Sequence, residues 1–224
     1  MLYRTRKTPL GPESRLVDAL IADRTRHDAP QMIMKEPNLP TGYPDLVFVY
    51  ARTDPQHLPC FRHAGLTVQH IKLVHHVYAS GGGTIREIVQ TSQIPERRLK
   101  LLLDDLVGAR MLRMNGSQIR VRALSRIFFA RKIVAVEAKI ADWQRAIAQA
   151  ILNTWFASES YVLLPPPISL SALATAEHHG IGIIVSDGSG VHYMTKPVSH
   201  RQPASYGSWL INEWAVQQLC KETK

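Results

Sequence analysis

Residues 132–139 read Lys-Ile-Val-Ala-Val-Glu-Ala-Lys, a mostly apolar run that predicts a buried strand. Two charged side chains, Glu137 and Lys139, lie near the end of this run. Because the side chains of a strand alternate between its two faces, we expect Glu137 and Lys139 on the same face, roughly 7 Å apart along the strand. A carboxylate and an ammonium group on so apolar a strand are costly to bury unless they are paired or bind a metal ion.

Strands and helices alternate on both sides of this strand. The sequence predicts helices at residues 12–23, 143–157, 169–179 and 206–220, and further strands at residues 32–34, 45–50, 161–164, 181–186 and 191–195. This order is typical of an α/β fold in which helices flank both faces of a mixed sheet.

Residues 61–123 have a different character. The sequence predicts a helix at 67–80 that ends at three glycines, a short helix at 85–90 that begins with a capping box of Thr84 and Glu87, and a longer helix from Pro95 to about Val107. Asn115-Gly116 then joins two short strands in a hairpin. Three helices followed by a hairpin are typical of a winged helix. We therefore expect an inserted winged-helix domain at 61–123 and one discontinuous domain made of 1–60 and 124–224.

A second buried strand also carries an acidic residue at one end. Asp45 follows Pro44 and begins the apolar stretch at 45–50. If this strand is adjacent to residues 132–139, Asp45 and Glu137 together offer oxygen ligands to Mg²⁺ or Mn²⁺. Lys139 can then orient a water molecule or stabilise the charge that develops on a phosphate. A metal ion, its bound water and a nearby cation are the groups that phosphodiester hydrolysis requires.

Pro44-Asp45, followed at a distance by Glu137-Ala138-Lys139, resembles the motif of the PD-(D/E)xK nuclease superfamily. The resemblance covers about residues 10–50 and 130–195. It implies a restriction-endonuclease-like sheet and a Mg²⁺-dependent deoxyribonuclease, in which Asp45 and Glu137 hold the metal and Lys139 positions the attacking water.

Two further positions match the superfamily. Glu13 lies in the first predicted helix, where many members carry an additional acidic residue at the metal site. Gln144, in the helix after Glu137-Ala138-Lys139, matches a glutamine that supports the site or contacts the DNA backbone in several branches.

Each of these residues also has a simpler interpretation. Glu137 and Lys139 can form an ion pair on an edge strand, and Asp45 can be a turn residue after Pro44. Glu13 is a residue type favoured in a first helical turn, and Gln144 is a common type on helix surfaces. For Asp142 we favour a helix cap over a metal ligand.

The charge of the chain indicates a polyanionic partner. Lys and Arg number 27 against 18 Asp and Glu, which gives a net charge of +9 and a pI of about 9.8. Nucleic acid is the commonest such partner. No apolar run approaches the ~20 residues of a membrane-spanning helix, so we expect no membrane partner.

The N-terminal residues and the cysteines predict a cytoplasmic protein. Met1 to Lys7 is basic but Pro and Gly follow it, so no signal peptide is expected. The two cysteines, Cys60 and Cys220, form no CxxC pair, which fits a reducing cytoplasm and argues against a disulfide framework.

The basic residues of the winged helix are the candidate DNA contacts. We expect the helix that begins at Pro95 to enter a DNA groove and the hairpin to contact the backbone. The candidate residues are Arg86, Arg97, Arg98, Lys100, Arg113 and Arg120. The alternative is a protein-interaction or dimerisation module.

The sequence therefore predicts a metal-dependent DNA endonuclease. The alternative is a DNA-binding regulator, or a partner-dependent assembly subunit, that uses a non-cleaving nuclease-like scaffold. Beside DNA, we expect a second copy of the chain or a partner protein of a defence or mobile-element system.

Overall fold

The computed structural model describes residues 2–4, 11, 13–52, 65–187, 189–201 and 204–222. The chain divides into two compact units. The first unit consists of Met1–Arg52 and Ala130–Ser208, and the second of Thr53–Phe129 and Trp209–Lys224. Of the helices in these described ranges, none combines the length and apolar character that crossing a membrane requires.

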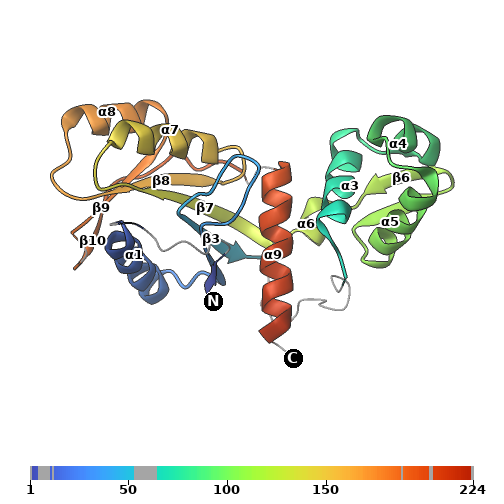
Figure 1. The fold of residues 1–224 in the computed structure, drawn as a ribbon, viewed down its shortest axis with the longest axis horizontal. Helices are drawn as coiled ribbons and strands as arrows, with labels where there is room; N and C mark the ends of the chain where they lie inside the picture. The colour runs from blue at the N-terminus through green and yellow to red at the C-terminus, as the bar shows by residue number, and fades with distance from the viewer. Residues whose placement is uncertain are drawn as a thin grey trace. The chain divides into compact units, whose positions relative to one another are not determined.

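The first unit is built on a mixed sheet whose described strands follow the order β1-β2-β3-β7-β8-β9-β10 (Figure 1). β3 pairs antiparallel with β2 and β7, whereas β8 pairs parallel with β7 and β9. At the edges, β1 is parallel to β2 and β10 is antiparallel to β9. The strands are β1 (Leu2–Arg4), β2 (Met32–Lys35), β3 (Leu46–Ala51), β7 (Ala130–Ala138), β8 (Glu159–Leu164), β9 (Gly182–Ser186) and β10 (Val191–Thr195). The predicted α/β class with a mixed sheet flanked by helices is confirmed.

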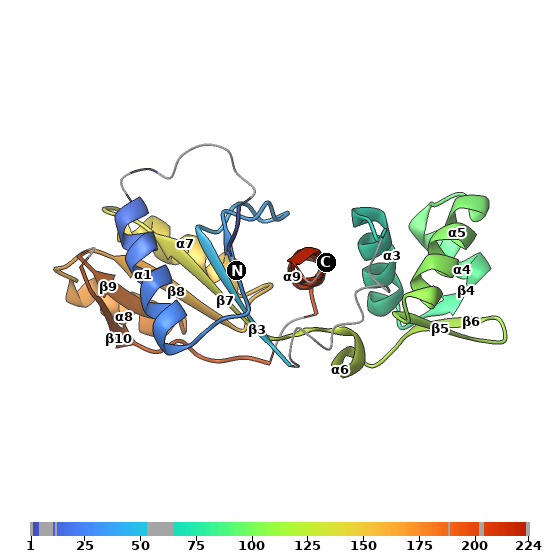
Figure 2. The ribbon, with the colours of Figure 1, turned by 90° about the horizontal axis from the view of Figure 1, so that it is seen from below.

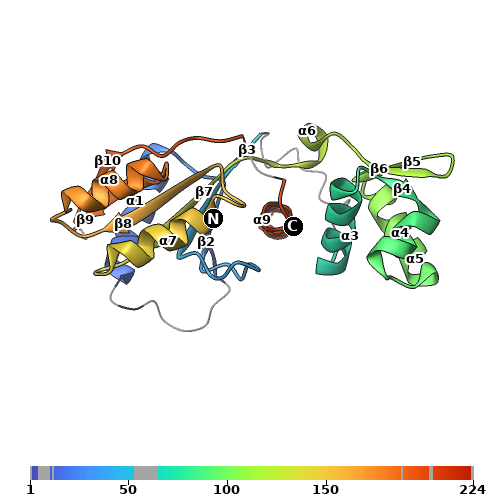
Figure 3. The same cartoon turned by 90° about the horizontal axis from the view of Figure 1, so that it is seen from above.

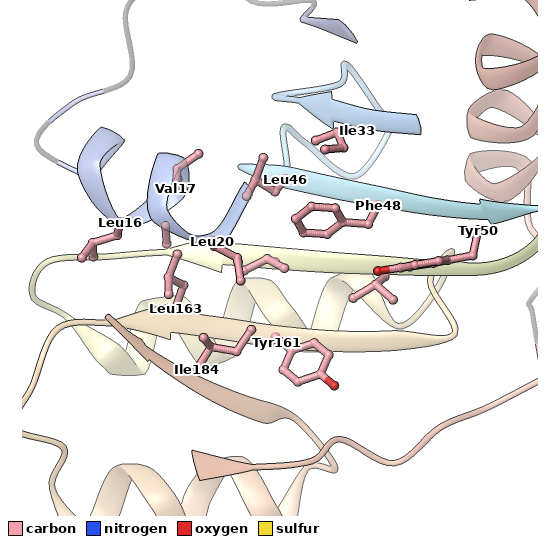
Figure 4. Packing of buried hydrophobic residues seen from close by; sticks show 13 residues of the cluster. Leu16, Val17, Leu20, Ile33, Leu46, Phe48, Tyr50, Tyr161, Leu163 and Ile184 are labelled. Atoms are coloured by element: carbon pink, nitrogen blue, oxygen red, sulfur yellow. The ribbon is translucent and has the colours of Figure 1, made fainter. Parts of the chain in front are cut away.

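Helices cover both faces of this sheet. α1 (Ser14–His27) lies on one face, and α7 (Trp143–Asn153) and α8 (Leu170–His178) lie on the other (Figures 2 and 3). Strand alternation decides which side chains meet which helix. Under α1, one core contains Leu16, Val17, Leu20, Leu46, Phe48, Val134, Val136, Ala138 and Leu163 (Figure 4). Under α7 and α8, a second core contains Ala146, Ile147, Ala150, Val162, Leu164, Ala176 and Ile183.

The second unit contains the helices and the hairpin that the sequence predicts, together with two short elements that it does not predict. Its elements before the last helix are α3 (Val68–Ala79), β4 (Gly83–Thr84), α4 (Ile85–Ser92), α5 (Glu96–Gly108), β5 (Leu112–Asn115), β6 (Gln118–Val121) and α6 (Leu124–Ile127). The strands form an antiparallel sheet in the order β4-β6-β5. The predicted capping box is present, with Thr84 Oγ1 accepting from the Glu87 amide and Glu87 accepting from the Thr84 amide.

The C-terminal helix belongs to a different unit from the one that the sequence predicts. The predicted first domain includes 124–224, but residues 209–224 and 124–129 belong to the second unit. The reason is packing by α9 (Tyr206–Glu222): the buried indole of Trp209 lies 4.6 Å from the ring centroid of Phe128, and Asn212 Oδ1 accepts a 2.8 Å hydrogen bond from the Phe129 amide. Element order alone does not reveal such a contact between distant segments.

The expectation of reduced cysteines is also wrong, because Cys220 in α9 is disulfide-bonded. The other cysteine of the sequence, Cys60, lies outside the described residues. The two cysteines are far apart in the chain, so their spacing carried no disulfide signal.

Candidate active site

β3 and β7 bring Asp45 and Glu137 together. In the antiparallel register Leu46 lies opposite Val136, and one step further along the same register Asp45 lies opposite Glu137. Because Leu46 and Val136 belong to the core under α1, alternation places both acidic residues on the other face, which α7 covers. The predicted meeting of two distant carboxyl groups is therefore present in the fold.

Asp45 is held by the end of β7. Its Oδ2 atom accepts a 2.7 Å hydrogen bond from the Ala138 amide and lies 3.5 Å from Nζ of Lys139. The same Nζ atom donates a 2.9 Å hydrogen bond to the Ala138 carbonyl. The side chains of Lys139 and Asp45 are 22% and 17% exposed, so solvent reaches this side of the site.

Glu137 lies deeper. It is 2% exposed, and its Oε1 atom accepts a 2.8 Å hydrogen bond from Nδ2 of Asn153 in α7. When both acids are ionised, Oε2 of Glu137 is buried without a hydrogen-bond donor among the described residues. A buried oxygen of this kind is costly to leave unsatisfied.

The environment raises the pKa of both acids. Burial, the nearby charge of Asp45 and a side-chain hydrogen bond with Asp45 raise the pKa of Glu137 to about 8, against the opposing effects of Asn153 and Lys139. Burial also raises the pKa of Asp45, against the opposing effects of Lys139 and the Ala138 amide. Two carboxylates this close disfavour joint ionisation unless a proton or a cation lies between them.

The pair fits a divalent cation with few protein ligands. Within the described ranges, no group of three or more His, Cys, Asp and Glu side chains is placed to hold a metal ion. Mg²⁺ is commonly bound by one or two carboxylates, with water and substrate phosphates completing its coordination. The Oε2 atom of Glu137, which lacks a donor when both acids are ionised, and the carboxylate of Asp45 match that donor set.

The structure does not bring Glu13 and Gln144 into this group. Glu13 is the N-cap of α1, which covers the opposite face of the sheet, and no hydrogen bond or ion pair among the described residues joins it to the acidic pair. Gln144 lies in the first turn of α7 with an exposed side chain. Asp142 caps α7 as predicted, since its Oδ1 atom accepts a 3.1 Å hydrogen bond from the Arg145 amide.

Sequence analysis missed two buried residues at the site. Asn153 gave no signal, because a single amide near a helix end is unremarkable. Glu36 follows β2 directly, and its amide donates a 3.1 Å hydrogen bond to the Asp45 carbonyl. It is 4% exposed, and its charge contributes to the raised pKa of Asp45. An acidic residue at the end of an apolar stretch is the signal that identified Glu137, and it applies equally to Glu36.

All six candidate DNA contacts in the second unit are exposed, namely Arg86, Arg97, Arg98, Lys100, Arg113 and Arg120. Two of them have partners in the protein: Lys100 lies 2.7 Å from Glu96, and Arg98 donates a hydrogen bond to Gln69. A pocket of about 480 Å³ lies beside them, lined by α3, the turn before α5 and Arg98. In the first unit, a pocket of about 80 Å³ adjoins the loop after Lys139 and is lined by Ile140, Trp143 and Pro165 among others.

Comparison with known proteins gives no match of the chain to a protein-family model, a curated protein or a solved structure.

Proposed function

We propose that the chain is a metal-dependent DNA endonuclease whose reaction centre consists of Asp45, Glu137 and Lys139. The observation that carries the proposal is the placement of two carboxyl groups with raised pKa values beside an ammonium group at the end of two central strands, with one buried oxygen that lacks a donor when both acids are ionised. A scaffold without a ligand at this position has no need for buried carboxylates.

The fold supports the same proposal. α1, β2, β3, β7, α7 and β8 follow the helix–strand–strand–strand–helix–strand order of the restriction-endonuclease-like core, and the Thr53–Phe129 part of the second unit is inserted between β3 and β7. We interpret α3, α4 and α5 with the β5–β6 hairpin as a winged helix that holds the DNA. This interpretation agrees with the excess of Lys and Arg in the chain.

Each residue of the centre has a distinct role in this proposal. Asp45 and Glu137 hold a Mg²⁺ or Mn²⁺ ion, which when bound polarises the scissile phosphate and lowers the pKa of a water molecule. Asn153 fixes the orientation of Glu137 through its 2.8 Å hydrogen bond. Lys139, held by the Ala138 carbonyl, keeps its ammonium group beside Asp45, where it can orient the attacking water and stabilise charge on the phosphate. Glu13 and Gln144 have no part in the centre as we propose it.

One observation favours the competing function of a non-cleaving DNA-binding scaffold or a partner-dependent subunit. No third ligand group is placed beside Asp45 and Glu137 within the described ranges, so the Lys139–Asp45 ion pair can be read as purely structural. The two functions differ in whether the purified chain hydrolyses DNA.

The test is cleavage of supercoiled plasmid and single-stranded circles by the full chain with Mg²⁺, with Mn²⁺ and with EDTA. We expect metal-dependent nicking that falls by about 10²-fold or more in Glu137→Gln and in Lys139→Met. Lys132→Met is the matched control, because Lys132 lies at the other end of β7 in an ion pair of 3.1 Å with Glu159. DNA binding without cleavage by the wild type would instead favour the scaffold or the partner-dependent subunit.

A further inference from the structure

The exposed side of α5 is nearly neutral. It carries three basic and three acidic side chains, namely Arg97, Arg98, Lys100, Glu96, Asp104 and Asp105. Lys100 is paired with Glu96 at 2.7 Å, and Asp105 lies 3.0 Å from His70 of α3. Phosphate binding depends on a local excess of positive charge, so α5 is a poor surface for a DNA backbone.

The segment at and after the end of α5 carries positive charge without any acidic residue. From Leu106 to Phe129 the sequence has no Asp or Glu but has five arginines, which are Arg110, Arg113, Arg120, Arg122 and Arg126. This segment consists of the end of α5, the β5–β6 hairpin and α6.

Strand alternation in the hairpin places three of these arginines, Arg113, Arg120 and Arg122, on one face. Arg122 is half-buried, and its Nε atom donates a 3.3 Å hydrogen bond to the Leu112 carbonyl. Arg113 lies directly opposite Arg120, and the Arg122 amide extends the same ladder by a 3.0 Å hydrogen bond to Met111. Leu112 and Ile119, which alternate with them, are fully buried on the other face. Two like charges directly opposite each other destabilise a sheet, and an anion bound to both removes that cost.

The chain just before β4 has no side chain beside Arg120. Gly83 pairs with Ile119, so Gly82 lies beside Arg120 at the next step of the register. A Cβ atom on Gly82 would fall 2.5 Å from the Ile119 carbonyl oxygen and 2.7 Å from Cγ of Arg120, and the φ angle of +97° also favours glycine. The aliphatic part of Arg120 thus lies against bare backbone at Gly82, whereas the β4 side chain on this face, that of Thr84, lies opposite Gln118.

We propose that the outer face of the β4-β6-β5 sheet, with Arg113, Arg120 and Arg122, is the surface by which the second unit binds the phosphate backbone of duplex DNA, in place of α5. Guanidinium groups suit this role because they bind phosphate oxygens with two parallel hydrogen bonds. Backbone contacts carry no base information, so binding has little sequence preference. The inference rests on the DNA-binding part of the proposed function.

The test is binding of a fluorescent duplex to the full chain in EDTA across a series of NaCl concentrations. We expect Arg113→Gln with Arg120→Gln to weaken binding about tenfold or more at low salt, and to reduce the slope of log K against log salt by about 2. Arg97→Gln with Lys100→Gln removes the same charge from α5 and should change affinity by less than about twofold. Arg113→Lys with Arg120→Lys keeps the charge and should keep the wild-type slope. This control distinguishes a loss of charge from a loss of folding in the glutamine variant.

The result that overturns the inference is an α5 variant that loses as much affinity as the sheet variant, or a sheet variant that binds like the wild type. A wild type that binds no duplex at any salt concentration would remove DNA binding from the proposed function as well. The two failures are therefore distinguishable by the behaviour of the wild type.

Discussion

The side-chain amide of Asn153, near the end of α7, donates a 2.8 Å hydrogen bond to Oε1 of Glu137 in β7, and both residues are buried. Asn153→Ala removes this amide donor from the carboxyl group of Glu137. We expect the free energy of unfolding to fall by about 1–3 kcal/mol, the usual cost of leaving a buried polar group unsatisfied. The loss of free energy of unfolding should be larger at pH 9 than at pH 5.5, because ionised Glu137 depends more on the Asn153 donor than protonated Glu137 does.

The measurement is thermal denaturation in EDTA of four proteins: the wild type, Asn153→Ala, Glu137→Gln and the double variant. If the loss of stability comes from the hydrogen bond, Asn153→Ala lowers the free energy of unfolding by less in the Glu137→Gln background, where no charge is left unsatisfied. Equal costs in both backgrounds would show that Asn153 contributes packing alone.

The raised pKa of Glu137 predicts how stability depends on pH. In the folded, metal-free protein this pKa is about 8, compared with a reference value of 4.5. Between these values the folded state binds a proton that the unfolded state has released, so the free energy of unfolding falls as pH rises through this window. The contribution is present below about pH 4.5 and lost above about pH 8.

Glu137→Gln removes this titration. We expect its melting temperature in EDTA to decline less than that of the wild type between pH 5.5 and pH 8.5, with a difference of several degrees for a chain of this size. Parallel pH profiles for the two proteins would contradict the raised pKa.

A divalent cation should replace the proton that the acidic pair shares. At pH 8, Mn²⁺ or Mg²⁺ at about 100 times its dissociation constant should stabilise the folded protein by about 2.7 kcal/mol. Asp45→Asn and Glu137→Gln should abolish this stabilisation, whereas Gln144→Ala and Glu13→Gln should retain it. Thermal shift in a metal titration measures the effect without any substrate, and a wild type that shows no shift would remove the metal from the proposed centre.

Much of the sheet was predictable from sequence, for a physical reason. Strands such as Leu46–Ala51 and Ala130–Ala138 are buried on both faces, so they read as apolar runs, and an acidic residue at one end of such a run is conspicuous. Asp45 and Glu137 were found in this way. Glu36 gave the same signal after β2 but was not recognised.

Other features had no local signal. The choice of sheet face separates Glu13 from Glu137, and it depends on which face α1 covers. The assignment of α9 to the second unit depends on a contact between Trp209 and Phe128. The disulfide of Cys220 depends on the course that the folded chain takes in space. Each of these is a long-range relationship that residue type and periodicity do not encode.

The burial of Arg24 is another long-range relationship that residue type does not reveal. A basic residue in an amphipathic helix is expected at the surface. Arg24 is instead 6% exposed, with its Nη1 atom 2.6 Å from Asp28 Oδ2 and 3.2 Å from the Tyr50 hydroxyl. Its guanidinium carbon lies 5.1–5.6 Å from three ring centroids, those of Phe48, Tyr161 and Tyr193. These contacts join α1 to β3, β8 and β10.

Arg24→Met should therefore loosen α1 from the sheet. We expect a loss of about 2–4 kcal/mol, since the substitution removes hydrogen bonds to a charged group together with cation–π contacts. Arg26→Met is the matched control, because Arg26 is exposed on the same helix and its replacement should change stability by less than about 0.5 kcal/mol. Hydrogen exchange read at the amides of α1 makes the comparison local: exchange should accelerate in Arg24→Met and remain unchanged in Arg26→Met. Equal exchange rates in the two variants would mean that the apolar side chains of α1, such as Leu16 and Leu20, hold the helix without help from the guanidinium group.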